Sequence, residues 1–166
     1  MEIKYFNSNF DKITQNKDTD QSIANLIEKL PSLNIVSDKN LLEETIKISK
    51  QFKEKKEKII VFGTGGSNLG ARALNNIISN NKIILEFYDN VDPINFEKNF
   101  QNINFELTGF LVISKSGTTP ETLSQFSCLY QKAIEANKVE DFFSNTLIIT
   151  EFKESPLFNI AKDNNC

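Results

Sequence analysis

The fold class follows from the stretch Ile59-Ile60-Val61-Phe62-Gly63-Thr64-Gly65-Gly66-Ser67-Asn68-Leu69-Gly70, in which a short apolar run leads through glycines into a helical pattern. A second stretch repeats this order and contains the loop Ser114-Lys115-Ser116-Gly117-Thr118-Thr119-Pro120-Glu121. Apolar runs that end at glycine are typical of buried strands, and apolar residues at 3.6-residue spacing favour helices. We therefore predict two strand–loop–helix units, each with a loop rich in small and hydroxyl-bearing residues.

The rest of the chain continues the alternation of strands and helices. We predict strands at residues 59–62, 83–88, 109–113 and 145–150, and helices at 22–30, 40–56, 67–79, 93–100, 119–137 and 156–163. Asp38 is a plausible cap for the second of these helices. The most N-terminal residues are polar with scattered aromatics, and we expect an irregular arm with a short strand or turn.

Alternating strands and helices are typical of βαβ units. The expected fold is a three-layer α/β/α sandwich with a mostly parallel sheet of flavodoxin-like order, preceded by a helical N-terminal segment. We expect residues 1–57 to form the arm and the helices that pack on the domain, and residues 58–166 to form the domain itself. Domains of this kind often add a strand where this chain stops, which favours a C-terminal truncation.

Composition excludes several classes of function. The chain has 166 residues and a net charge of -3, which gives no basic footprint for nucleic acid. It contains no histidine, so imidazole chemistry cannot come from it, and Arg72 is its only arginine. Its two cysteines, Cys128 and Cys166, lack the spacing of a C-x-x-C metal site. Without a signal peptide or a long apolar run, a cytoplasmic protein without membrane partners is the default expectation.

Both loops carry the chemistry of a phosphate site. Backbone N–H groups at the start of a helix, hydroxyl groups and one lysine are suited to holding a phosphate group. The simpler alternative is that both loops are ordinary turns: Ser67 would cap one helix, Thr118 and Glu121 would form a capping box on the other, and Lys115 would reach solvent. Capping does not explain why Ser114, Ser116 and Thr119 gather directly after a predicted buried strand.

Two familiar nucleotide motifs fail on spacing. The dinucleotide pattern G-x-G-x-x-G requires a glycine at position 68, where the chain has Asn68. A P-loop that begins at Gly65 and reaches Gly70 requires Lys-Ser/Thr next, where Ala71-Arg72 stands. In a flavodoxin-like sheet, strands 1 and 3 are neighbours at the switch point. The two loops would then face a single anionic ligand.

With these residues in view, the chain resembles the first sugar-isomerase (SIS) domain of the glucose-6-phosphate isomerase family. The resemblance rests on G-T-G-G-S-N-L-G from Gly63, on S-K-S-G-T-T-P-E-T from Ser114, and on the intervening segment Tyr88–Pro93. It covers residue 59 to the end of the chain, with weaker similarity upstream. Thr150–Ala161 also resembles the family's stretch after the fourth strand.

The resemblance implies roles for six residues. Ser114, Lys115, Ser116 and Thr119 would hold the substrate phosphate, and Gly66 and Ser67 would line the sugar side of the site. The family interconverts glucose 6-phosphate and fructose 6-phosphate through a cis-enediol, without a cofactor. The resemblance also implies a glutamate base, an arginine, a histidine and a lysine from the later part of the family's sequence. This chain has no matching segment, so we assign it no catalytic residue.

Two further interpretations stay open at this point. A stand-alone SIS module would sense a phosphosugar and regulate a partner, and another SIS isomerase or aminotransferase-type domain would act on a different phosphosugar. Under the isomerase interpretation, we expect this chain alone to bind sugar phosphate weakly and to be inactive. The full-length parent would be a homodimer.

Overall fold

A computed structural model describes residues 17–30, 34–78, 82–151 and 153–166. The chain divides into two compact units, Met1–Lys47 and Ile48–Cys166. The first unit contains α1 (Lys17–Lys29) and the 3₁₀ helix η2 (Ile35–Ser37), and α3 (Lys39–Phe52) begins in it and ends in the second. The arm expected at the N-terminus lies, up to residue 16, outside the described residues.

Helix α3 begins where the sequence predicts. The Asp38 carboxylate accepts a hydrogen bond from the Leu41 N–H at 3.0 Å, which satisfies one of the free donors of the first turn. The helix ends at Phe52, four residues before the predicted end, because Lys55 adopts a positive φ of 59°. A left-handed residue breaks the helical hydrogen-bond ladder.

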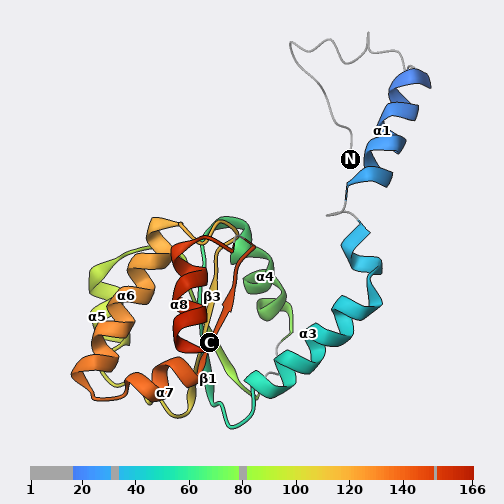
Figure 1. Cartoon of the computed structure of the whole chain (residues 1–166). Coiled ribbons are helices and arrows are strands. Elements are labelled where there is room, and N and C mark those ends of the chain that lie inside the picture. The colour runs from blue at the N-terminus through green and yellow to red at the C-terminus, as the bar shows by residue number, and fades with distance from the viewer. Residues whose placement is uncertain (1–16, 31–33, 79–81, 152) are drawn as a thin grey trace. The chain divides into compact units, whose positions relative to one another are not determined.

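The second unit is built on a four-stranded sheet. Its strands are β1 (Lys58–Phe62), β2 (Ile84–Tyr88), β3 (Thr108–Ile113) and β4 (Thr146–Ile149), all parallel, in the order β2-β1-β3-β4. The helices between and after these strands are η3 (Gly65–Ser67), α4 (Leu69–Ile77), α5 (Pro93–Asn99), α6 (Pro120–Glu135), α7 (Val139–Ser144) and α8 (Pro156–Asn164) (Figure 1). The expected α/β class, with strands 1 and 3 as neighbours, is confirmed.

One face of the sheet carries the hydrophobic core. Phe62 and Phe110 point from neighbouring strands into a cluster of aromatic rings, and both are fully buried. Helices α5, α6, α7 and α8 supply the facing side chains, among them Phe96, Phe142 and Leu157. Burying a large aromatic or aliphatic side chain contributes roughly 1.5–3 kcal/mol each, so this face contributes most of the domain's hydrophobic stabilisation.

Helix α7 was not expected from the sequence. Its six residues contain adjacent phenylalanines, of which Phe142 is fully buried while Phe143 packs against the core from its edge. Six residues are too few for a helical period to stand out from a short apolar run. The stacking of Phe142 against Tyr130, with ring centroids 6.0 Å apart, gives the helix its place on α6.

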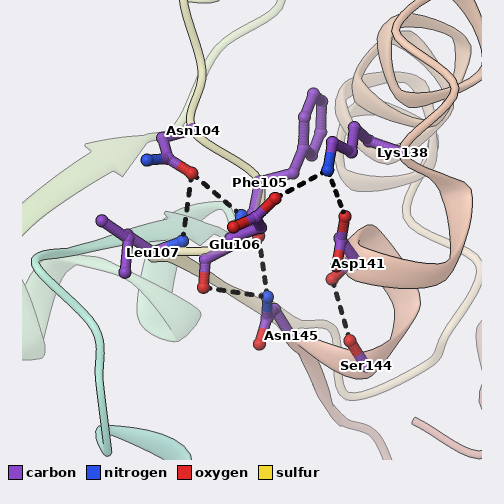
Figure 2. A network of polar contacts seen from close by, with 8 residues as sticks. All are labelled: Asn104, Phe105, Glu106, Leu107, Lys138, Asp141, Ser144 and Asn145. Atoms are coloured by element: carbon purple, nitrogen blue, oxygen red, sulfur yellow. Dashed lines mark hydrogen bonds and ion pairs between the residues drawn. The ribbon is translucent and has the colours of Figure 1, made fainter.

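A polar network closes the edge of the sheet at which β3 and β4 begin (Figure 2). The Asn145 amide donates to the Phe105 carbonyl at 2.7 Å and so ties the residue before β4 to the loop before β3. Lys138 contacts Glu106 at 2.7 Å and Asp141 at 3.0 Å, and both contacts raise the pKa of its ammonium group. The network orders the loops opposite the predicted site.

Candidate functional site

The two predicted loops leave the sheet at the same edge from neighbouring strands. Phe62 near the end of β1 pairs with Val112 of β3, and because the strands are parallel both loops start from their carboxyl ends. A Cβ on Gly63 would lie 3.2 Å from the Ser67 Cβ and 3.3 Å from the Ile113 carbonyl oxygen, so the first loop and the end of β3 approach closely at this glycine. The expected juxtaposition of the two strand ends is confirmed.

The first loop forms the 3₁₀ turn η3 instead of running directly into the helix. Gly65 takes a positive φ of 54° and, like Gly66, is exposed to solvent, whereas Ser67 is partly buried. The predicted cap was wrong: Ser67 lies inside η3, and Asn68 is the N-terminal boundary residue of α4. The fully buried Asn68 amide donates to the Gly63 carbonyl at 3.0 Å and closes the loop.

The second loop is organised around a buried hydroxyl. Ser114 is 3% exposed, and its Oγ lies 2.8 Å from the Thr119 Oγ1, so one of the two hydroxyls donates to the other. The Ser114 Oγ also accepts from the Gly117 N–H at 3.1 Å. Gly117 has a φ of 66°, the left-handed conformation that glycine adopts without steric cost. These contacts curl the loop at the N-terminus of α6.

The predicted capping box on α6 was also wrong. Pro120 is the first helical residue, which makes Thr119, and not Thr118, the N-cap residue. The Thr118 hydroxyl donates instead to the Ser116 Oγ at 3.0 Å. Proline fixes φ near the helical value and lacks an N–H, so it suits the first helical position and places the N-cap at Thr119.

Lys115 provides the cation of the second loop. Its side chain is 78% exposed, and its Nζ lies 3.4 Å from a carboxylate oxygen of Glu151, which is 61% exposed. Ion pairs between such exposed groups contribute about 0–1 kcal/mol. The lysine is therefore held only weakly and can exchange this partner for a stronger anion.

The segment that follows β4 braces the second loop, a relationship that sequence reasoning missed. The Lys115 carbonyl accepts from the Glu151 N–H at 3.1 Å and from the Thr150 hydroxyl at 3.4 Å. The Gly117 carbonyl accepts from the Leu157 N–H at 3.2 Å. The Ser155-Pro156 pair is a local signal for the start of α8, but no local signal indicates which distant loop it contacts.

A cavity of about 560 Å³ lies elsewhere, along the outer edge of β2. Arg72 pairs there with Asp89 at 3.0 Å, and Lys58 pairs with Glu86 at 2.9 Å. Burial, followed by the charge of Glu86, raises the pKa of the Tyr88 hydroxyl to about 12. Four of the five charged side chains of the lining pair with each other, Lys98 being the fifth, and the two loops do not line the cavity. This cavity is therefore a poorer candidate for the phosphate site than the loops are.

The described part of the chain shows neither a metal-binding cluster nor a membrane-spanning helix. Residues 17–30, 34–78, 82–151 and 153–166 contain no group of three acidic, cysteine or histidine side chains placed to hold a metal ion. Nor does any helix described for these residues have the length and apolar character needed to cross a membrane.

The fold and loops define a doubly wound α/β domain with two loop–helix junctions at the switch point of its sheet. The phosphoglucose isomerase family matches residues 17–164, and the chain belongs to that family. A glucose-6-phosphate isomerase of Campylobacter jejuni is 36% identical over 95 residues, which are 55% of this chain and 23% of that protein. One of Thermus thermophilus is 28% identical over 122 residues, which are 72% of this chain and 29% of that protein.

Solved structures agree with the sequence comparisons. A hypothetical protein from Thermus thermophilus, TT0462, superposes with a TM-score of 0.66 and 27% identity over 74% of this chain and 30% of its own. A glucose-6-phosphate isomerase from Chlamydia trachomatis gives a TM-score of 0.60 and 25% identity over 69% of this chain and 23% of its own. The chain thus spans about a quarter of the length of these relatives.

Proposed function

We propose that this chain supplies the phosphate-binding part of a glucose-6-phosphate isomerase. Its family membership and the curled loop Ser114–Thr119 at the N-terminus of α6 support this function. A helix N-terminus places N–H donors and a partial positive charge next to an anion. The loop adds hydroxyls and the exposed Lys115 ammonium at the same place.

Each of the six residues has a distinct part in this proposal. Ser114, Ser116 and Thr119 hold the phosphate through their hydroxyls, and Lys115 leaves Glu151 to balance the ligand's charge. Because one of the Ser114 and Thr119 hydroxyls donates to the other, one proton of this pair and the Ser116 proton are directed to phosphate oxygens. The exposed Gly66 and the neighbouring Ser67, at the end of the adjacent strand, line the sugar side of the site. The hydrogen bonds already made within the second loop support a binding geometry formed in advance, which lowers the entropy cost of binding.

The proposed reaction moves a proton between C1 and C2 of the open-chain sugar through a cis-enediol, and it needs no cofactor. The groups that open the ring and transfer the proton come from the part of the family's polypeptide that this chain does not match. The phosphate loop contributes by fixing the position of the substrate relative to those groups. We therefore expect the 166-residue chain alone to bind sugar phosphates and not to interconvert them.

Calorimetry on the purified chain tests the binding part of this proposal. Glucose 6-phosphate, fructose 6-phosphate and glucosamine 6-phosphate are titrated separately, with unphosphorylated glucose as the control. We expect heat of binding from the first two ligands and none from glucose. Binding of glucose as strong as that of glucose 6-phosphate would contradict a phosphate site, and a clear preference for glucosamine 6-phosphate would favour a different SIS enzyme.

A matched pair of variants locates the site. Ser116→Ala removes a hydroxyl from the loop, whereas Ser127→Ala removes an exposed hydroxyl further along α6. Loss of one hydrogen bond to a charged ligand corresponds to about 1.5–3 kcal/mol, or a tenfold or greater weakening of binding. We expect this effect for Ser116→Ala alone. Equal affinities for both variants and the unchanged chain would place the ligand elsewhere.

An isomerase assay on the same preparation tests the catalytic part. We expect no conversion of fructose 6-phosphate to glucose 6-phosphate above the uncatalysed rate, and substantial turnover would show that the proton-transferring groups lie within the chain. We further propose a cytoplasmic location and, for a family-length protein, a homodimer. Fractionation of the source cells and sedimentation of the family-length protein test these two points.

A further inference from the structure

The loop after β2 is bonded to both of the helices that follow the two candidate loops. Asp89 pairs with Arg72 of α4 at 3.0 Å, and α4 follows the first loop. The carbonyl of the next residue, Asn90, accepts a hydrogen bond at 2.8 Å from the Gln125 side chain of α6, which follows the second loop. We call these two contacts, Arg72–Asp89 and Gln125–Asn90, the helix clamp.

The Gln125 contact crosses the end of β1. In the strand order β2-β1-β3-β4, a side chain that runs from the helix after β3 to the loop after β2 must pass the carboxyl end of β1. The first candidate loop begins there at Gly63, whose N–H donates to the Tyr88 carbonyl of β2 at 3.4 Å. Helix α6 also contacts β1 itself. Gln125 therefore lies where the first loop, the helix of the second loop and the loop after β2 converge.

The strands fix only where the two candidate loops begin. Parallel pairing of β1 with β3 sets the loop starts side by side, but the proposed ligand contacts extend to Ser67 before α4 and to Thr119 before α6. A helix can shift on its sheet without breaking the strand pairing, because it packs through side chains. The distance between the two helix N-termini therefore depends on contacts that the helices themselves make, such as the helix clamp.

The Gln125 side chain contributes little to stability for a residue so deeply buried. It is 1% exposed, and its Oε1 has no hydrogen-bond partner among the described residues; the same holds for the Oγ1 of Thr122, one turn earlier in α6. A buried acceptor without a partner opposes folding and offsets much of what the Nε2 hydrogen bond contributes. A buried polar residue that stability alone does not favour, placed beside a candidate site, is expected to serve that site.

We propose that Gln125 is a positioning residue of the sugar-phosphate site, which it serves by holding the two loops at the separation that one ligand requires. The inference rests on the proposed function. Gln125 acts through Asn90, and the Arg72–Asp89 pair holds the other helix to the same loop. Its effect falls on a ligand that reaches both loops and leaves unaffected a ligand that the second loop holds alone.

Two ligands report on the loops separately. Glucose 6-phosphate reaches both loops in the proposed site, whereas inorganic phosphate occupies the second loop alone. The variant Gln125→Met removes the amide and keeps a side chain of similar length, and Gln131→Met makes the same change at an exposed position of α6. Each ¹⁵N-labelled protein is titrated with both ligands and followed by NMR, and urea denaturation measures its stability.

We expect Gln125→Met to bind glucose 6-phosphate at least about fivefold more weakly than the unchanged chain, and inorganic phosphate within about twofold of it. The urea midpoint should not fall, because the unpartnered acceptor is removed together with the hydrogen bond. Gln131→Met should match the unchanged chain with both ligands. Unchanged affinity of Gln125→Met for glucose 6-phosphate overturns the proposal. Equal weakening of both ligands also overturns it, because that result indicates a purely structural role.

The other half of the helix clamp keeps the test decisive if Gln125→Met does not fold. Asp89→Leu breaks the half-exposed pair with Arg72. Because the loss of a negative charge favours both anions, the ratio of the two affinities reports on the spacing of the loops. We expect the preference for glucose 6-phosphate over inorganic phosphate to fall at least about twofold. An unchanged ratio overturns the proposal.

The unchanged chain separates this inference from the proposed function. If it binds inorganic phosphate as tightly as glucose 6-phosphate, the first loop adds nothing to binding; the positioning role is then overturned and the phosphate site stands. If it binds neither ligand, the proposed function fails, and the positioning role fails with it.

Discussion

A Cβ placed on Gly117 would lie 2.0 Å from the Oγ and 2.5 Å from the Cβ of Ser155, two residues from separate loops that meet at the carboxyl edge of the sheet. The contact leaves room for a hydrogen atom and nothing larger. It joins the loop after β3 to the start of α8, where the Ser155 hydroxyl caps the helix by accepting from the Phe158 N–H at 3.2 Å. The candidate phosphate loop is therefore held in place by the start of α8 as well as by its own hydrogen bonds.

We predict that Gly117→Ala strongly destabilises the domain. Alanine must adopt the left-handed backbone and also displace Ser155, and together these effects cost about 2–5 kcal/mol. The matched control is Gly65→Ala, since Gly65 also has a positive φ but no atom lies within 4 Å of its added Cβ. Urea denaturation followed by circular dichroism should give a loss of about 1–2 kcal/mol for the control. Equal losses of stability in both variants would mean that the contact between the added Cβ and Ser155 is not destabilising.

We predict that Asn68→Ala destabilises the first loop. The buried amide of Asn68 donates to the Gly63 carbonyl, and its removal leaves that acceptor unsatisfied at a cost of about 1–3 kcal/mol. Asn76→Ala, an exposed change on the same helix, is the control and should alter stability by less than about 0.5 kcal/mol. Chemical denaturation of the two variants side by side provides the measurement. A neutral Asn68→Ala would mean that the loop is held without this hydrogen bond.

We predict that Lys115→Met weakens sugar-phosphate binding and leaves the stability of the domain nearly unchanged. The weak pair with Glu151 contributes little, so the free energy of unfolding should change by less than about 1 kcal/mol. Affinity for glucose 6-phosphate, measured by calorimetry, should fall about tenfold or more because a charge-assisted contact is lost. Lys153→Met, an exposed change in the neighbouring segment, should leave both quantities unchanged. Undiminished affinity in Lys115→Met would exclude the lysine from the site.

We predict that Tyr88 makes stability fall in alkaline solution. Its pKa is about 12 in the folded chain, against an ordinary value of 10.0, so the unfolded chain loses the phenolic proton first. The stabilisation is therefore fully present below pH 10 and is lost as pH rises toward 12. Tyr88→Phe should show a shallower decline over that range. The stability of both proteins is measured by denaturation from pH 8 upward. A parallel decline of the two above pH 10 would mean that the tyrosine is not the cause.

The order of elements could be predicted because its signals are local. An apolar run such as Ile59–Phe62 marks a strand directly. Helix starts are marked in the same local way by prolines at positions 93, 120 and 156. The two loops could be singled out for the same reason, since their hydroxyls and glycines are contiguous. Six residues are proposed as ligand contacts, and their roles stay predictions that calorimetry decides: Gly66, Ser67, Ser114, Lys115, Ser116 and Thr119.

The chain's local chemistry accounts for a parallel α/β domain with two hydroxyl-rich loops, because periodicity and turn propensity act over short distances. Which atoms meet was decided only by the folded structure. Within each loop the tertiary structure selected one hydrogen-bond pattern among several that the sequence allows: Thr119 bonds to Ser114, and Asn68 closes the first loop on Gly63. The approach of Ser155 to Gly117 joins separate loops whose spacing along the chain carries no information about their separation in space, because the order of the strands brings them together.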